Sequence, residues 1–181
     1  RTAAIAKHTN AFKINEDVVI PLPRMGDYCD GVERINIELS LHNKLKFLDA
    51  LDELFAGELP LHYQDDAQLG DAELLGTRQQ EAKKILAEVR GRWEWLRDNL
   101  DTPSSESLVV SRELNLKPVT SDYRLATGNP TVFDAVQRHE LRASWKRELR
   151  EPLRQIFSGS TYQPVLEQCQ SIHQKTLKSR V

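Results

Sequence analysis

Histidine, cysteine and carboxylate side chains, which carry most acid–base and metal chemistry in proteins, are scattered along this chain. Five histidines occur, namely His8, His42, His62, His139 and His173. No two of them have the spacing of a helical metal site, and no Cys-x-x-Cys pair occurs. His42 lies within an apolar helical pattern and His139 stands beside Glu140, so both are predicted to be helix-seam or surface residues.

Other catalytic patterns are missing as well. The eight glycines are isolated from one another, so the sequence has neither a dinucleotide-binding fingerprint nor a phosphate-binding loop. The carboxylate pairs Glu16–Asp17 and Asp65–Asp66 have no surrounding pattern that predicts a cleft, and we interpret them as surface charge. Cys29 and Cys169 are far apart, which favours two reduced thiols in a cytoplasmic protein over a disulfide.

The charge balance argues against nucleic acid and anionic membranes as partners. The chain of 181 residues has 25 basic and 27 acidic residues, for a net charge of -2. Acidic residues at 140, 148 and 151 alternate with six arginine and lysine residues, and this pattern predicts ion pairs within one helix. The six basic residues are Arg138, Arg142, Lys146, Arg147, Arg150 and Arg154. No apolar run approaches the ~20 residues that span a bilayer.

Two long helices are predicted in the first half of the chain. The first runs from Arg24 to Phe55, and its expected seam is Tyr28, Val32, Ile35, Leu39, His42, Leu45, Leu48, Leu51 and Phe55. The second runs from Asp71 or Thr77 to Leu100, and its expected seam is Ala82, Leu86, Val89, Trp93, Leu96 and Leu100. Thr77 and Gln80 fit a capping box.

Two further helices are predicted after an irregular connector, residues 102–128. The third starts at Asn129–Pro130 and continues to Ile156, with Pro152 expected to kink or end it. The fourth starts at a Ser160/Gln163 capping box and carries a seam of Tyr162, Val165, Cys169, Ile172 and Thr176. Helices with such seams pack as an up-and-down bundle.

The segment Lys13–Met25 differs from everything after it. Val18, Val19 and Ile20 form a β-branched run that Pro21 and Pro23 terminate, which is typical of one short strand. A strand needs a partner for its backbone groups, and no second strand is predicted with comparable clarity. Together with a start at Arg1, this orphan strand suggests that the chain is an excerpt of a longer protein.

The same stretch carries a family resemblance. The run His8-Thr-Asn-Ala-Phe-Lys-Ile-Asn-Glu-Asp-Val-Val-Ile-Pro-Leu-Pro-Arg-Met-Gly26 resembles the start of the C-terminal substrate (cap) domain of FAD-linked oxidases. These flavoproteins oxidise D-lactate, glycolate and related 2-hydroxy acids. The closer likeness is to large bacterial FAD/FMN-containing dehydrogenases, some of which are fused to iron–sulfur modules. The match covers about Arg1 to Gly57, and Glu58–Val181 would be a helical insertion.

The resemblance implies where the chemistry of such a protein lies. FAD would bind an upstream domain of the same polypeptide, and a downstream motif would face the flavin. Family members place a lysine just before the strand to meet the substrate carboxylate, which makes Lys13 the candidate substrate-binding residue. The interval from Lys13 to Asp17 is longer than in the simplest members, so Asn15 is the alternative. No catalytic, cofactor-binding or metal-binding residue is expected in this chain.

We therefore expect a mainly α fold, an up-and-down bundle of about four long helices with one short extended segment near the N-terminus. Residues 1–22 would be the end of a lead helix and the cut edge of a cap-domain sheet, and residues 23–181 the helical bundle. The expected function is that of a scaffold fragment of a flavin-dependent 2-hydroxy-acid oxidoreductase, inactive in isolation. The alternative is a helical interaction or oligomerisation module that docks a partner, or its own copy as a homodimer, through the exposed face of the second or third helix. Trp95 and the long connector are the features that suggest it.

Overall fold

The computed structural model describes residues 19–61, 70–103 and 130–178, and the elements within these ranges are helices. The α-helices are α1 (Met25–Ala56), α2 (Gly70–Asp98), α4 (Val132–Gln137), α5 (Glu151–Ile156) and α6 (Gln163–Lys178). A π-helix, η2 (Lys146–Arg150), leads directly into α5, and two 3-10 turns are η1 (Leu22–Arg24) and η3 (Ser160–Tyr162). The predicted mainly α fold is confirmed. These ranges contain no strand, only an isolated bridge between Pro103 and Thr131.

The chain divides into two compact units, residues 1–33 and residues 34–181. In the first unit the described part comprises Val19 and Ile20, which lie outside any helix or strand, then η1 and the start of α1. None of its described residues is buried. Val18 and the rest of the predicted strand lie outside the described residues.

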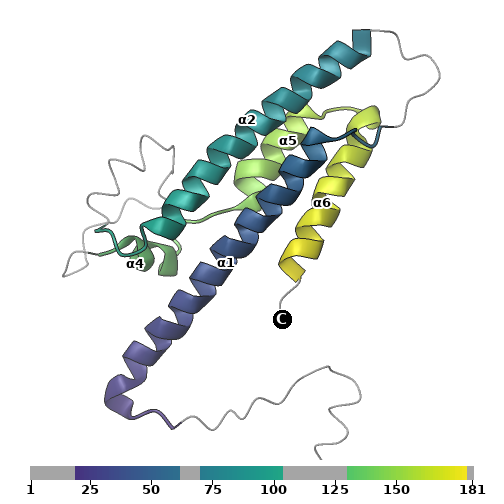
Figure 1. The fold of residues 1–181 in the computed structure, drawn as a ribbon. Helices are drawn as coiled ribbons and strands as arrows, with labels where there is room; N and C mark the ends of the chain where they lie inside the picture. The colour runs from purple at the N-terminus through teal and green to yellow at the C-terminus, as the bar shows by residue number, and fades with distance from the viewer. Residues whose placement is uncertain (1–18, 62–69, 104–129, 179–181) are drawn as a thin grey trace, which may run out of the picture. The chain divides into compact units, whose positions relative to one another are not determined.

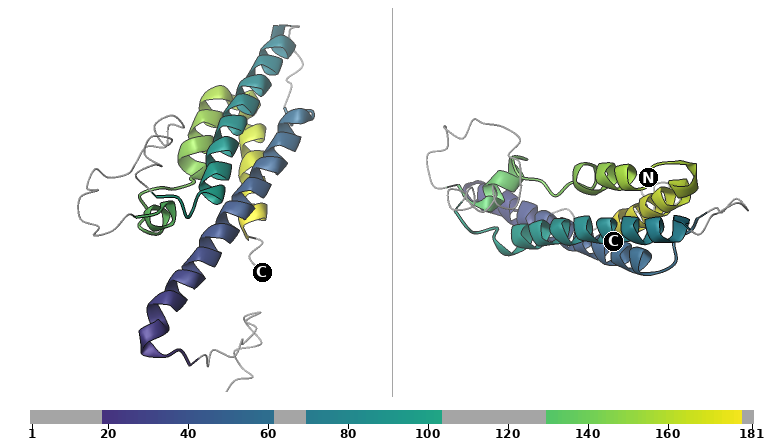
Figure 2. Two further views of the ribbon diagram at one scale, coloured as in Figure 1. Left: turned by 60° about the vertical axis from the view of Figure 1, so that its left-hand side comes forward. Right: turned by 90° about the horizontal axis from the view of Figure 1, so that it is seen from above.

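The second unit is a four-helix bundle. From Arg34 onward, α1 runs beside α2 and α6, and η2 with α5 packs against α2; neighbouring helices alternate in direction (Figures 1 and 2). Their apolar faces meet in one main core. Its largest fully buried side chains are Phe47, Leu48, Leu51, Phe55, Leu86, Val89, Trp93, Leu149, Leu153 and Phe157. Burial of apolar surface from all four helices therefore stabilises the unit.

The seam of α2 is confirmed at every predicted position. Ala82, Leu86, Val89, Trp93, Leu96 and Leu100 are all buried. The helix begins at Gly70, however, so Thr77 lies inside it and the predicted Thr77/Gln80 capping box is wrong. The Ser160/Gln163 box is also wrong, because the turn before α6 has Gly159 at its N-cap and no capping side chain. The predicted seam of α6 holds, with Val165 and Cys169 buried.

The predicted seam of α1 is right only in its second half. Leu45, Leu48, Leu51 and Phe55 are buried, but upstream of them the buried residues are Ile37 and Leu41. Leu39 and His42 are exposed. Leu39 and Leu41 are two residues apart, about 200° around a helix axis, so they face nearly opposite directions. Two apolar stripes thus follow each other along α1, and the one through Leu39 does not enter the bundle core.

A second, smaller core closes the other end of the bundle. It unites Ile37 and Leu41 of α1 with Leu96 and Leu100 of α2 and with the short helix α4. Two backbone hydrogen bonds join α4 to the end of α2: Val132 N–H donates to the Thr102 carbonyl and Phe133 N–H to that of Leu100. Trp95, which lies off the predicted seam of α2, packs against this cluster. The two ends of the predicted connector therefore meet, although residues 104–129 lie outside the described ranges.

The predicted third helix is broken in the structure. It starts later than Asn129–Pro130, at a Thr131 N-cap, where a capping box with Asp134 satisfies both residues' backbone N–H groups. It stops at Gln137 in a Schellman motif, with His139 in the left-handed region at φ 63°. The Glu140 N–H donates to the Ala135 carbonyl and the His139 N–H to the Val136 carbonyl, the two bonds that define this motif.

The chain resumes its helical path through the π-helix η2. The Arg147 N–H donates to the Ser144 hydroxyl, 3.4 Å away, which caps the turn beginning at Trp145. Pro152 follows in the first turn of α5, where its missing N–H is tolerated. The expected disturbance at Pro152 is thus a change of helix type immediately before it. π-Helical turns often occur at functional sites.

The core contacts of Leu51 predict a large cost for truncating it. Leu51 is fully buried in the main core, so Leu51→Ala is expected to lower the free energy of unfolding by about 2–5 kcal/mol. The matched control is Leu74→Ala in α2, because Leu74 is exposed and should cost less than about 0.5 kcal/mol. Urea denaturation followed by circular dichroism measures both. Equal effects of the two substitutions would contradict the assigned core.

Candidate functional site

The residue predicted to bind substrate, Lys13, lies outside the described residues. The same holds for Asn15, for the carboxylate pairs Glu16–Asp17 and Asp65–Asp66, and for His8 and His62. The substrate-binding role of Lys13 therefore stays a prediction. The groups that the structure does place are the remaining histidines, both cysteines, and the charged residues of the bundle.

Neither histidine that the sequence singled out forms a site. His42 is exposed rather than in the seam of α1. His139 is exposed too, and its backbone serves the helix stop; its carbonyl accepts a hydrogen bond from Arg142 Nε at 3.1 Å. Within the described ranges, no three His, Cys, Asp or Glu residues are grouped so that they could hold a metal ion.

The two cysteines are free, as predicted. Cys29 is exposed, whereas Cys169 is buried in the main core. Burial raises the pKa of the Cys169 thiol to about 12, because the apolar surroundings disfavour the thiolate. Since the thiolate is the reactive form, Cys169 is a packing residue rather than a nucleophile.

The most concentrated polar contacts in the bundle surround Glu148 of the π-helix. One carboxylate oxygen accepts from Arg92 Nε at 3.1 Å, and the other accepts from the Trp93 indole N–H at 3.0 Å and the Ser144 backbone N–H at 2.6 Å. The Arg92 and Glu148 side chains are only 15% and 16% exposed. This cluster links two helices and the start of η2.

Lys44 lies near the same carboxylate. Burial lowers the pKa of Lys44, and the charge of Glu148 acts in the opposite direction. The Lys44 ammonium donates to the Ser40 hydroxyl one turn earlier in α1, at 3.1 Å. Because the three donors to Glu148 occupy its oxygens, this carboxylate is held in a structural role rather than left free for proton transfer.

The Glu148 contacts overturn one sequence-based expectation. The acidic residues at 140, 148 and 151 were predicted to pair with arginines and lysines of their own helix. Within the described ranges no such ion pair forms, and Glu148 pairs instead with Arg92 of α2. Of these residues only Glu151 has basic residues three or four positions away, namely Arg147 and Arg154. Glu148 has no basic residue at that spacing, so its partner has to come from another helix.

An aromatic group closes the side of the bundle between η2 and α6. The rings of Trp145 and His173 stack at 5.0 Å, and Phe47 meets both edge-on, at 4.9 Å and 5.3 Å. Sequence reasoning gave His173 no role. The signal available was its position one residue after Ile172, which belongs to the predicted seam of α6.

Exposed apolar side chains gather at the start of the chain's described part. In the first unit Val19, Leu22, Met25, Tyr28 and Val32 are exposed, with Leu22 at 85%. In the second unit Ile35 and Leu39 are exposed as well, at 57% and 55%. A row of exposed apolar side chains of this size marks a contact surface. Within the first unit, Leu22, Met25, Tyr28 and Val32 form such a row, and they are the candidate docking surface of the protein.

No described helix is long and apolar enough to cross a membrane. Comparison with protein-family models, with curated proteins and with solved structures found no match for this chain.

The position of His173 predicts a pH-dependent stability. Burial among rings lowers the pKa of His173 below its ordinary value of 6.5, so the folded state favours the neutral imidazole. The unfolded chain then binds more protons below about pH 6.5, and the free energy of unfolding falls as the pH drops through that range. Above about pH 6.5 the imidazole is neutral in both the folded and the unfolded state, so His173 no longer makes the free energy of unfolding depend on pH.

His173→Phe keeps a ring in the stack but cannot titrate, so it should reduce the loss of stability between about pH 7.5 and about pH 5. Urea denaturation at the two pH values measures this loss. His42→Gln is the control, since His42 is exposed and its removal should leave the pH dependence as in the wild type. An unchanged pH dependence in His173→Phe would show that this imidazole is not held neutral by the fold.

Proposed function

We propose that this chain is a non-catalytic scaffold of a larger flavoprotein that oxidises a 2-hydroxy acid. The segment before the bundle docks onto the FAD-containing part of that polypeptide, and the bundle is an insertion behind it. Two things support the proposal: the resemblance of residues 8–26 to the start of a cap domain, and the bare apolar side chains that follow that stretch. The exposed apolar side chains are the observation that supports the docking role.

The described part of the first unit has no core of its own. Leu22, Met25, Tyr28 and Val32 recur every three or four residues, as on one face of a helix, and each is 40% exposed or more. Full burial of such a side chain contributes about 1.5–3 kcal/mol, so leaving four of them in water is costly. The bundle, in contrast, buries its own apolar faces. The first unit is therefore the part that needs a partner.

A second copy of the chain is the other candidate partner. Ile35 and Leu39 favour it, because they are exposed apolar side chains of the unit that folds around its own core. Residues 22–39 carry more acidic than basic side chains. The acidic ones are Asp27, Asp30, Glu33 and Glu38, and the basic ones are Arg24 and Arg34. Two copies of an acidic surface repel each other, so the flavoprotein domain is the preferred partner.

Hydrogen–deuterium exchange of residues 22–33 tests this proposal. We expect these amides to exchange faster in the isolated chain than in the longer flavoprotein, because docking protects the helix start there. In the flavoprotein, Tyr28→Glu should remove the protection, whereas Leu74→Glu, an exposed position in α2, should not.

Equal exchange in the two proteins would contradict the docking role. Protection in the isolated chain that rises with protein concentration would instead identify a second copy as the partner. Reading the gene on both sides of this chain gives an independent check, since the proposal requires a flavin-binding domain upstream.

A further inference from the structure

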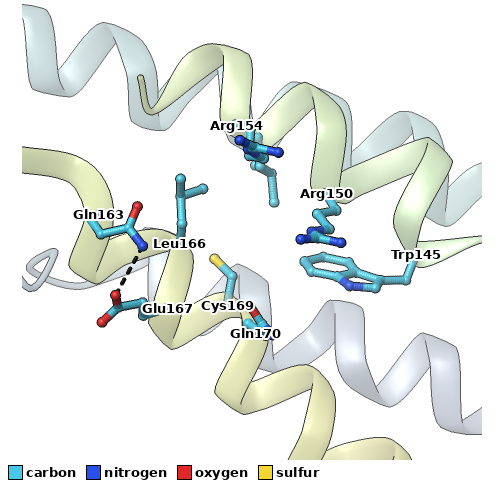
Figure 3. Close-up of a pocket in the computed structure, with 9 residues that line it drawn as sticks. Trp145, Arg150, Arg154, Gln163, Leu166, Glu167, Cys169 and Gln170 are labelled. Carbon is cyan, nitrogen blue, oxygen red and sulfur yellow. Dashed lines mark hydrogen bonds between the residues drawn. The ribbon is translucent and has the colours of Figure 1, made fainter. Parts of the chain in front are cut away.

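A pocket of about 210 Å³ opens on the face of the bundle where η2 and α5 meet α6. Arg150 and Arg154 stand on one wall, and residues of α6 form the other (Figure 3). Apolar side chains make its floor, since Leu153 and Cys169 are both buried members of the main core. The pocket thus joins a cationic rim to an apolar base.

The two rim arginines are exposed and, like those of Arg138 and Arg147, their side chains have no hydrogen-bond partner among the described residues. Arg34, Arg78, Arg90, Arg92 and Arg97 each donate to a carboxylate or to a carbonyl. Arg150 and Arg154 donate to no residue that the structure describes, and their only near acid in the pocket lining, Glu167, makes no ion pair with either. Arg150 and Arg154 stand on one wall because side chains four residues apart lie on the same face of a helix. Like charges at this spacing repel, at a cost of a few tenths of a kcal/mol that a shared anion would offset.

The charge of the lining selects the kind of anion. Two guanidinium groups and the Glu167 carboxylate give the pocket a net charge of one positive unit, which matches a monoanion better than a dianion. Glu167 is held by the Gln163 side-chain amide at 3.0 Å, and so its charge is directed toward that residue. Guanidinium groups bind carboxylates with two parallel hydrogen bonds.

The apolar base selects a ligand with a hydrocarbon part. Leu153, Leu166 and the indole of Trp145 line the pocket, and they offer no charge to a second polar group. Pockets for drug-sized ligands measure about 300 Å³ or more, so this smaller one suits a molecule of only a few carbon atoms. A carboxylate on a short alkyl chain meets all three requirements of charge, polarity and size.

We propose that this pocket binds a short-chain monocarboxylate, with the carboxylate between Arg150 and Arg154 and the alkyl chain against Leu153, Leu166 and Trp145. The site is separate from the docking surface at the start of the chain. It lies wholly within residues 145–170 and requires no flavin and no other domain.

Titration of the intact chain with sodium butyrate, followed by amide and indole N–H signals in NMR spectra, tests the proposal. The chain has three tryptophans, and Trp145→Phe identifies the Trp145 indole signal. We expect that signal to shift saturably with butyrate in low-salt buffer. Arg150→Gln and Arg154→Gln should each raise the Kd about tenfold, as expected for loss of one charge-assisted pair.

Arg147→Gln is the matched control, because Arg147 is an exposed arginine of the same π-helix that does not line the pocket. It should leave the Kd within about twofold of the wild-type value. Two other ligands should bind more weakly than butyrate. 1-Butanol has the alkyl chain without the carboxylate, and inorganic phosphate has a negative charge without an alkyl chain. A shift that never saturates, equal effects of Arg147→Gln and Arg150→Gln, or tighter binding of phosphate would each overturn the proposal.

Discussion

The Glu148 carboxylate, whose side chain is only 16% exposed, makes the contacts on which the second unit depends most. A carboxylate removed from water costs several kcal/mol unless donors replace the lost hydration. Here Arg92, the Trp93 indole and the Ser144 backbone supply three hydrogen bonds, and they come from α2 and from the start of the π-helix. The donors of α2 can reach this carboxylate only when η2 packs against α2 with Glu148 turned toward Arg92 and Trp93.

That packing has consequences for the rest of the bundle. With Glu148 turned toward α2, the next positions along the helix place Leu149 and Leu153 in the main core. Arg150 and Arg154 then fall outside the core, beside α6, without a carboxylate to bind. The wide π turn ends immediately before Pro152, which cannot donate in a regular helix. The orientation of Glu148 thus explains why Leu149 and Leu153 pack in the core. It also explains why Arg150 and Arg154 line the pocket without an ion pair.

The positions of α1, α2 and α6 and the seam of α2 were predictable from the sequence, because each helix carries a continuous apolar stripe. The register of α1 was not, since Tyr28–Leu39 and Leu45–Phe55 look like one stripe in sequence while Ile37 and Leu41 are the buried pair. The stop at His139 was missed because a non-glycine residue takes the left-handed conformation there. The partner of Glu148 and the role of His173 depend on tertiary contacts that no local pattern encodes.

The functional residues likewise divide into those that the sequence indicates and those that depend on tertiary contacts. Lys13 and the cap-domain likeness come from sequence alone, and Lys13 lies outside the described residues. The docking surface combines both sources, since the apolar spacing at Tyr28 and Val32 is visible in sequence but the structure shows that these side chains are bare. The pocket is a product of packing, because its two walls are separated by the turn between α5 and α6.

The central claim is that the Glu148 carboxylate couples the π-helix to α2. A double-mutant cycle with Arg92→Ala and Glu148→Ala, read as the free energy of unfolding in urea, tests it most directly. The account predicts a coupling energy of about 1–3 kcal/mol for this buried pair. The same cycle on the exposed pair Arg34 and Asp101 should give less than about 1 kcal/mol. A coupling for Arg92 and Glu148 no larger than that of the exposed pair would contradict the account.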